Sequence, residues 1–460
     1  MQFWKGFVFI SLLGLLLAFL LNTNDVGDLF LPDMPNVTLK EIWGYRDMNS
    51  SSVVEIVIKV PDSTLENLKI RLKNRIVSTS LLDSNFLYGF NTDYLNNLID
   101  YWINQYQWRI WEAKMNKFRH YFTTIKGLQI HFIHVKPIVK SNQKLIPILL
   151  LHGWPGSFFE FYKLIPFLAE SNDTEDYAFE IICPSLVGYG WSDAALTPGF
   201  DIFAMSDIMF LLMERLNITS KFYIQGGDFG AMIAAGMSKI NPDKVAGIHV
   251  NMIEIPLYDF RFLTKVWIGS MLPSSIHFLS KEELDVLYPF TENLNIHFGR
   301  MGYFWLQATR PSTIGIVLSD SPSGLAAYII EKFGAWTHNH SYHMTSFDGG
   351  LETMKISKDE MLTNVMIYYI TNSISSSVRF YKEFLSESNE KLLKIPINVP
   401  AGIALFPHEL FRIPRKLAEI KYRNIRQFTY MPSGGHFAAL EEPELLSEDI
   451  ISFIKLVENA

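Results

Sequence analysis

The feature that most constrains the fold is a series of short apolar runs, beginning near residue 145, each of which ends in a Gly, Pro or Asp loop and precedes a helical stretch. The runs cover residues 146–151, 179–182, 221–224 and 245–250. This arrangement is typical of parallel β/α units, whose strands are buried on both faces. The sequence therefore predicts an α/β protein built on a parallel sheet.

The series of strands is interrupted in its second half. Residues 251–390 have a mainly helical, aromatic and Met-rich pattern, and strand-like runs return at 399–406 and 426–430. A helical cap inserted into the sheet explains this order best. We therefore predict a core formed by residues 138–250 and 391–460, with the cap between them.

Residues 24–137 have a different character, aromatic-rich and mainly helical. Apolar residues recur at helical spacing in 65–72, behind Pro61, and in 94–102. We predict an amino-terminal helical extension whose aromatic side chains pack against the main domain.

Residues 128–135 alternate as a β-strand, and we expect His131 and His134 on its surface. Cys183 is the only cysteine in the chain, which excludes an intramolecular disulfide and Cys-rich zinc sites. Because it follows an apolar run, we expect Cys183 to be a buried strand residue.

The amino terminus, residues 1–23, contains an uninterrupted apolar or small-residue run from Gly6 to Leu21. Its length favours a retained membrane anchor over a cleaved signal peptide, with Trp4 at the interface. Lys5 precedes the run, and three acidic residues follow it, namely Asp25, Asp28 and Asp33. The positive-inside rule then weakly favours a body outside the cytosol.

The stretch Gly226-Gly227-Asp228-Phe229-Gly230 lies between a strand-like run and a helix former. A nucleophile elbow has this order, and it needs small residues two positions before and after the central residue. Asp228 takes the position that serine more commonly occupies. We predict that Asp228 is a nucleophile.

The loop His152-Gly153-Trp154-Pro155-Gly156 follows the strand at 146–151, where an α/β-hydrolase places one oxyanion donor. The backbone N–H groups of Trp154 and Phe229 are the two candidate donors. We expect His152 to support the loop rather than act as a base.

His436 lies in the Gly-rich loop Ser433–Phe437 after the last predicted strand, and Glu409 follows the preceding one. The order Asp228, Glu409, His436 is the nucleophile, acid, histidine order of the α/β-hydrolase fold. Asp348 is the rival acid, but we interpret Asp348-Gly349-Gly350 as a turn.

An aspartate nucleophile attacks carbon and forms an ester, which His436, oriented by Glu409, would hydrolyse with water. An epoxide substrate would also need an acid near its oxygen, and a tyrosine of the cap suits this role. The chemistry requires no cofactor and no metal. The net charge of −7, without a Lys/Arg block, argues against nucleic acid as a partner.

The chain resembles the microsomal epoxide hydrolases, and within them the insect juvenile hormone epoxide hydrolases, over almost its whole length. The motifs that carry this resemblance include Phe86-x-Tyr88-Gly89, Trp108-Arg109, Gly127-Leu128-x-Ile130-His131-Phe132, His152–Gly156, the Asp228 elbow, Ser321–Tyr328, Arg379–Glu383 and Gly434–Ala438. One departure is Phe229, which is often tryptophan in relatives.

The resemblance implies Asp228 as nucleophile, Glu409 as acid and His436 as base. It also implies Tyr303 and Tyr381 as the pair that polarises the epoxide. It further implies an apolar epoxide and water as substrates, a vicinal diol as product, and a single-pass endoplasmic reticulum (microsomal) protein with a cytosolic body. We prefer this orientation to the one that the charges indicate.

Three alternatives stay open. The substrate is juvenile hormone or a broader set of xenobiotic epoxides. A haloalkane dehalogenase would keep the same nucleophile, and a non-catalytic binding protein could keep the scaffold. The cap aromatics Phe304, Trp305 and Trp336 indicate only an apolar pocket.

Overall fold

The computed structural model describes residues 31–460, apart from 48–49, 77–78, 141–142, 170–175, 338–339 and most of 254–298. The predicted membrane anchor at residues 1–23 lies outside the described residues. Within those residues no single helix is long and apolar enough to span a membrane. One pair, α13 (Pro311–Asp320) and α14 (Pro322–Thr337), bent by 117°, meets the length and composition requirement together.

The described strands form one nine-stranded sheet in the order β1-β2-β3-β5-β4-β6-β7-β8-β9. The first three strands are antiparallel, and the neighbours from β5 to β9 are parallel. The strands are β1 (Val53–Ile56), β2 (His120–Ile125), β3 (Leu128–Val135), β4 (Lys144–Leu151), β5 (Tyr177–Pro184), β6 (Phe222–Gly226), β7 (Val245–Val250), β8 (Ala401–Leu405) and β9 (Ile425–Tyr430).

The predicted parallel strands are all present, with ends within two residues of the expected ones. The central strands β4, β6 and β7 are almost fully buried, because helices cover them. Cys183 is buried in β5, as expected. The α/β-hydrolase fold is thereby confirmed.

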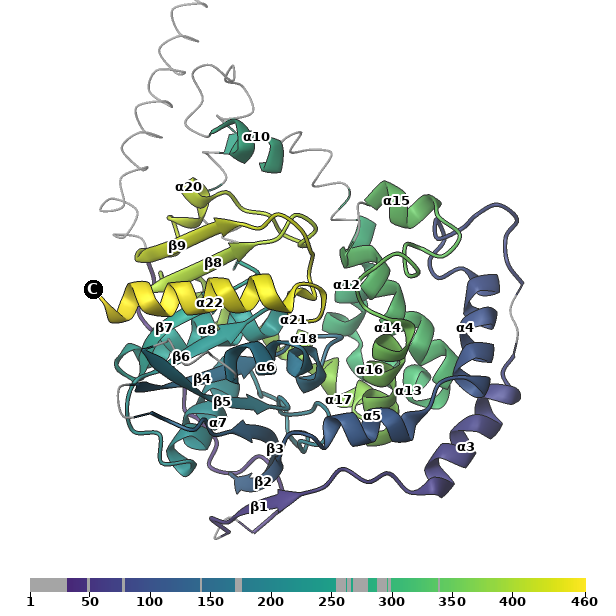
Figure 1. Cartoon of the computed structure of the whole chain (residues 1–460), viewed down its shortest axis with the longest axis horizontal. Coiled ribbons are helices and arrows are strands. Elements are labelled where there is room, and N and C mark those ends of the chain that lie inside the picture. The colour runs from purple at the N-terminus through teal and green to yellow at the C-terminus, as the bar shows by residue number, and fades with distance from the viewer. Residues whose placement is uncertain are drawn as a thin grey trace, which may run out of the picture.

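Two pairs of helices pack beside the sheet, α6 with α22 and α7 with α8. Figure 1 shows α22, in yellow, across the front of the sheet. The helices of this part are η1 (Phe158–Tyr162), α6 (Leu164–Ala169), α7 (Ile202–Arg215), α8 (Asp228–Ile240), η2 (Pro242–Lys244), α20 (Arg415–Ala418), α21 (Ala438–Glu441) and α22 (Pro443–Glu458).

The chain between β7 and β8 contains helices and no strand among its described residues, as the predicted cap requires. In Figure 1 most of these helices, in green, gather beside the sheet, and α10 lies apart from them at the top of the view. Besides α13 and α14 they are α10 (Lys281–Leu287), α12 (Gly302–Thr309), α15 (His340–Thr345), α16 (Lys358–Thr371), α17 (Ile374–Ser377), α18 (Arg379–Phe384) and α19 (Glu387–Lys394). The domain boundaries at residues 23, 137, 250 and 390 stay predictions.

The amino-terminal extension contains the predicted helices as α3 (Asp62–Lys73) and α4 (Thr92–Asn104), followed by α5 (Trp108–Met115). It also supplies β1 and β2, which the sequence did not predict. Its tyrosines do not simply pack on the main domain. Three of their hydroxyls bond to residues between β7 and β8, in the pairs Tyr94–Glu352, Tyr101–Asp359 and Tyr106–Thr363, at 2.7 to 2.9 Å.

The prediction that His131 and His134 lie on a strand surface was wrong. Both are buried, because β3 is an interior strand between β2 and β5. His131 accepts or donates through both ring nitrogens, at 2.9 Å to His120 and 2.8 Å to the hydroxyl of Ser185. Burial lowers the pKa of His120 to about 4 and lowers that of His131 well below its ordinary value.

This histidine pair makes stability depend on pH. Both folded-state pKa values lie below the ordinary value of about 6.5, so as pH falls below 6.5 the unfolded chain binds protons that the folded protein does not. The free energy of unfolding is therefore highest above pH 6.5 and decreases as pH falls toward 4. Each group contributes up to about 1.4 kcal/mol per pH unit.

We expect His120→Gln, which can still donate to the carbonyl of Met115, to reduce this slope. Urea unfolding followed by circular dichroism between pH 7 and pH 4.5 measures it. Equal slopes in the two proteins would contradict the assignment.

Candidate active site

The turn between β6 and α8 has the conformation of a nucleophile elbow. Asp228 is the first residue of α8 and has a φ of +48°, which is strained for a residue with a side chain. A Cβ atom at Gly226 would lie 2.4 Å from the backbone carbon of Gly230. A Cβ atom at Gly230 would lie 1.9 Å from the carbonyl oxygen of Leu151. Both positions therefore require glycine, as the sequence predicted.

The loop after β4 holds one oxygen of the Asp228 carboxylate. The backbone N–H of Trp154 donates to Oδ1 at 2.9 Å. This approach needs glycine at 153, because a Cβ atom there would lie 2.3 Å from the same oxygen. Phe229 is the second residue of α8, where backbone N–H groups have no acceptor within the helix. Of the two candidate oxyanion donors, the N–H of Trp154 thus contacts the carboxylate, and the N–H of Phe229 directly follows Asp228 in the chain and is left without a helical acceptor.

His436 connects the other two members of the predicted set. Its Nδ1 lies 2.6 Å from Oε1 of Glu409, and its Nε2 lies 3.5 Å from Oδ2 of Asp228. Because a carboxylate can only accept, the proton on Nδ1 points to Glu409. The backbone N–H of His436 donates to the carbonyl of Trp336 at 3.0 Å, and the two rings meet edge to face at 4.9 Å.

The surrounding charges favour the protonated imidazole. Burial alone would lower the pKa of His436, but the charge of Glu409 and the hydrogen bonds with Asp228 and Glu409 raise it well above its ordinary value. Two further carboxyls lie within electrostatic reach of His436. Desolvation raises the pKa of both Glu160 and Glu441 to about 8, so both are mainly neutral at pH 7 and compete little with Glu409.

Tyr303 on α12 and Tyr381 on α18 are close together beside the nucleophile. Their ring centroids are 5.9 Å apart, and the Trp154 ring stacks on Tyr303 at 5.4 Å and meets Tyr381 edge-on at 5.7 Å. The Phe229 ring packs against Tyr381 at 4.6 Å. Burial and the charge of Asp228 raise the pKa of both hydroxyls well above 10, so both tyrosines are protonated and can donate.

His152 and Asp348, which we did not expect to act as base and acid, have the structural roles that the sequence predicted. His152 Nε2 accepts from the backbone N–H of Leu186 at 3.1 Å, which supports the loop. Asp348 accepts from the backbone N–H groups of Gly350 and Glu352, as a turn residue does. Neither takes part in the hydrogen bonds around Asp228 and His436.

A cavity of about 600 Å³ lies beside the site, between the cap helices α12 and α14 and the amino-terminal extension. Its wall includes Tyr303 and Trp336, residues 86–90 of the extension, and the charged pair Glu331 and Lys332 on α14. Because Tyr303 and Trp336 belong both to this wall and to the site, the cavity can hold the part of a substrate that extends away from Asp228.

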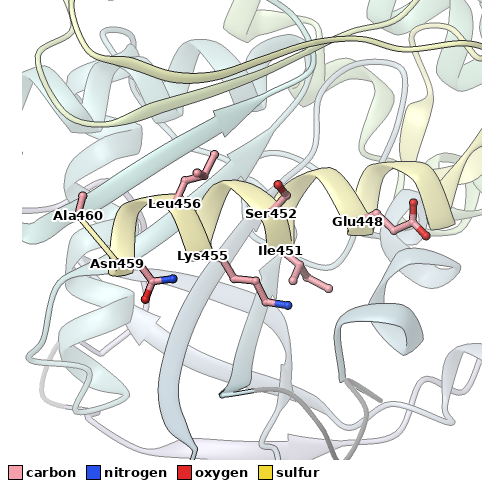
Figure 2. A pocket seen from close by; sticks show the side chains of 7 residues that line it. All are labelled: Glu448, Ile451, Ser452, Lys455, Leu456, Asn459 and Ala460. Atoms are coloured by element: carbon pink, nitrogen blue, oxygen red, sulfur yellow. The ribbon is translucent and has the colours of Figure 1, made fainter.

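A second hollow, of about 610 Å³, lies along the carboxyl-terminal helix α22 (Figure 2). Its lining comes from residues 448–460 and includes none of the predicted site residues. In the part of the chain that the structure describes, no group of three or more His, Cys, Asp or Glu side chains could hold a metal ion.

Comparisons with known proteins agree with this geometry. The family model "Epoxide hydrolase N terminus" matches residues 53–161, and "alpha/beta hydrolase fold" matches residues 146–272. Juvenile hormone epoxide hydrolase 1 of Ctenocephalides felis is 43% identical over 92% of this chain and 90% of its own length. The chain belongs to the epoxide hydrolase family.

Other members of the epoxide hydrolase family match equally long stretches. Epoxide hydrolase 1 of Sus scrofa is 39% identical over 99% of this chain and 100% of its own length. The crystal structure of juvenile hormone epoxide hydrolase from the silkworm Bombyx mori has a TM-score of 0.87 and 36% identity, covering 92% of this chain and 99% of that one.

Three ionisable residues around the site were not predicted from the sequence. Glu160 and Glu441 are acidic residues near His436, and Lys332 is a buried cation on the cavity wall. For Lys332 a sequence signal exists, because the pair Glu331-Lys332 interrupts an otherwise apolar helix between Ile330 and Phe333. Charges inside an apolar helix indicate a specific partner.

Replacing Glu409 by Gln tests the electrostatic coupling in the site. Without the carboxylate charge, the pKa of His436 falls, and turnover of an epoxide falls by roughly 10²- to 10⁴-fold. Titration of the His436 imidazole by ¹⁵N nuclear magnetic resonance measures the shift. Glu448→Gln, at an exposed site on α22, is the matched control. An unchanged titration in the Glu409 variant would contradict the coupling.

Proposed function

We propose that this protein hydrolyses apolar epoxides to vicinal diols through a covalent ester on Asp228, with juvenile hormone as the physiological substrate. The observation that carries the proposal is the position of the Asp228 carboxylate. It lies between the N–H of Trp154 and the imidazole of His436, next to the tyrosines Tyr303 and Tyr381.

In the first step, Oδ2 of Asp228 attacks an epoxide carbon. The C–O bond breaks, and its electron pair moves to the epoxide oxygen, which takes a proton from a tyrosine hydroxyl. Tyr303 and Tyr381 are suited to this step because both are protonated and next to the nucleophile. The products are an ester, a hydroxyl and a phenolate.

In the second step, water hydrolyses the ester. His436 takes a proton from the water, whose oxygen attacks the carbonyl carbon of Asp228, and the N–H groups of Trp154 and Phe229 stabilise the oxyanion. The diol leaves with one proton of the water, and the other stays on His436, which passes its own proton to the phenolate before it acts as the base.

The charge of Asp228 also affects the pKa of His436 differently in the two steps. In the free enzyme the Asp228 carboxylate helps to raise the pKa of His436, which favours the imidazolium. Ester formation removes that negative charge, so the pKa of His436 falls and its proton passes to the phenolate, which leaves the neutral imidazole that the second step needs. Glu409 retains its charge and holds the ring in both steps.

Juvenile hormone is proposed because relatives from the flea and the silkworm are named as hydrolases of this compound. The wall of the cavity next to Tyr303 includes aromatic and aliphatic residues, among them Phe86, Leu306 and Trp336, beside the charged pair on α14, and this apolar part suits an apolar chain. The pig and rabbit relatives are named only as epoxide hydrolases, so a broad set of xenobiotic epoxides is the second candidate.

Two other functions would use the same scaffold. A haloalkane dehalogenase would hold its halide with Trp or Asn donors, whereas here paired tyrosines are next to Asp228. A non-catalytic binding protein would not need the hydrogen-bonded set of Asp228, His436 and Glu409. Both are therefore less well supported than epoxide hydrolysis.

We further propose a single-pass amino-terminal anchor in the endoplasmic reticulum membrane, with the catalytic body in the cytosol. The apolar run at residues 6–21 supports the anchor, and an apolar substrate would reach the enzyme from lipid. The acidic residues after this run favour the opposite orientation, whereas the family resemblance favours the cytosolic one.

The enzymatic proposal predicts a trapped ester. In His436→Gln, incubation with juvenile hormone or styrene oxide adds the mass of the epoxide to the peptide that contains Asp228, because the first step proceeds and the second does not. Mass spectrometry of the digested protein measures this, and Asp228→Ala is the matched control. An unmodified peptide with both epoxides would contradict the mechanism.

Turnover measurements with the same two epoxides distinguish the candidate functions. Faster turnover of juvenile hormone than of styrene oxide supports the hormone as substrate. Replacing both Tyr303 and Tyr381 by Phe lowers epoxide turnover by at least roughly 10²-fold, since the oxygen then has no donor. Intact turnover in that double variant would contradict the epoxide mechanism.

The orientation proposal predicts that protease added to sealed microsomes digests the catalytic body without detergent. Immunoblotting with an antibody against the carboxyl-terminal helix measures the surviving protein, and a lumenal protein is the control. Full protection of the body would contradict the cytosolic orientation.

A further inference from the structure

Lys332 is a buried lysine next to a proposed proton donor. Its side chain is 11% exposed, and its Nζ lies 4.8 Å from the ring centroid of Tyr303 and 6.0 Å from that of Tyr328. A buried ammonium is costly unless other groups compensate its charge. The position of Lys332 therefore requires an explanation.

Glu331 compensates part of this charge. Its Oε2 forms an ion pair with Nζ of Lys332, and its Oε1 lies 3.9 Å from Nε2 of His343. Although burial raises the pKa of the Glu331 carboxyl, the charge of Lys332, its hydrogen bond and the nearby imidazole of His343 lower it to about 2. The carboxylate is thus ionised at every pH at which the enzyme would work.

The pair does not serve only to hold the helix, because its cation faces the substrate cavity. Glu331, Lys332, Tyr328 and Tyr303 all line the cavity of about 600 Å³. The ring of Tyr303 is in contact with Lys332 and also stacks on Trp154, whose backbone N–H binds Asp228. An ammonium is therefore in contact with a ring that belongs to the site.

We propose that Lys332 is a positioning residue that makes Tyr303 the stronger proton donor of the tyrosine pair. A positive charge over an aromatic ring is attracted to its electrons, and the attraction grows when the ring becomes a phenolate. Within the described residues, cation contacts of this kind involve the ring of Tyr303 but not that of Tyr381.

The inference rests on the proposed function and specifies its first step. When the epoxide C–O bond breaks, the oxygen takes the proton of Tyr303 and the charge moves to the phenolate below Lys332. Lys332 takes no part in this proton transfer, and the phenolate regains a proton from the His436 imidazolium before water attacks the ester. Lys332 therefore affects ester formation and leaves ester hydrolysis unchanged.

The test measures the two steps separately in the full-length protein. Stopped-flow tryptophan fluorescence with styrene oxide follows ester formation, and single-turnover mixing followed by quenching measures ester hydrolysis. We expect Lys332→Met to slow ester formation by roughly 3- to 30-fold, the range that a cation–π contact of this kind supplies. Ester hydrolysis stays within about twofold, and Lys332→Arg restores most of the lost rate because it retains the cation.

A double-mutant cycle with Tyr303→Phe distinguishes this role from a structural one. In the Tyr303→Phe background, Lys332→Met causes no further loss, since no hydroxyl remains to be activated. Equal losses with and without the hydroxyl, or equal slowing of both steps, would overturn the inference.

Two further variants act as controls. Lys358→Met removes a similar lysine–tyrosine contact, 5.4 Å from the ring of Tyr101 and away from the cavity, and leaves both steps unchanged. If Lys332→Met does not fold, Glu331→Gln with Lys332→Met removes both charges and leaves no unpaired carboxylate. If the wild-type protein forms no ester, the proposed function itself is contradicted. If the wild-type protein forms the ester and Lys332→Met forms it equally fast, only this inference is contradicted.

Discussion

The geometry of the site depends on the hydrogen bond from the backbone N–H of Trp154 to the carboxylate of Asp228. It joins the loops after β4 and β6, which are neighbouring parallel strands and so end at the same edge of the sheet. With Oδ1 held in this way, Oδ2 is left toward His436. The indole of Trp154 packs against both Tyr303 and Tyr381. Trp154 therefore contacts the nucleophile through its backbone and the two tyrosine proton donors through its side chain.

The cap side of the site is supported from outside by the amino-terminal extension. Tyr94, Tyr101 and Tyr106 bond through their hydroxyls to Glu352, Asp359 and Thr363. Figure 1 shows α3 and α4 on the outer side of the cap helices, away from the sheet. The extension also supplies β1, β2 and β3 to the edge of that sheet. It therefore connects the cap to the core by a second route besides the chain itself.

Much of this arrangement was readable in the sequence, and the failures have physical reasons. Some features depend only on neighbouring residues or on their order along the chain, and these were predicted correctly. They are the elbow glycines, the buried parallel strands and the order of Asp228, Glu409 and His436. Tyr303 and Tyr381 were identified from the resemblance to the epoxide hydrolases and not from residue spacing. Burial of His131 depends on which strands flank β3, and the contact of Lys332 with Tyr303 joins two cap helices, so neither follows from a local pattern.

The extension and its hydrogen-bonding partners are far apart in the chain, with separations of 248 to 258 residues. At a synthesis rate of roughly 5 to 20 residues per second, the partners leave the ribosome about 12 to 50 seconds after α4 and α5. During that time aromatic side chains such as Tyr94, Trp102 and Trp111, buried in the finished protein, have no cap to cover them. Biosynthesis thus exposes these apolar side chains before the residues that cover them, and exposed apolar surface of this kind is prone to aggregation until the cap is made.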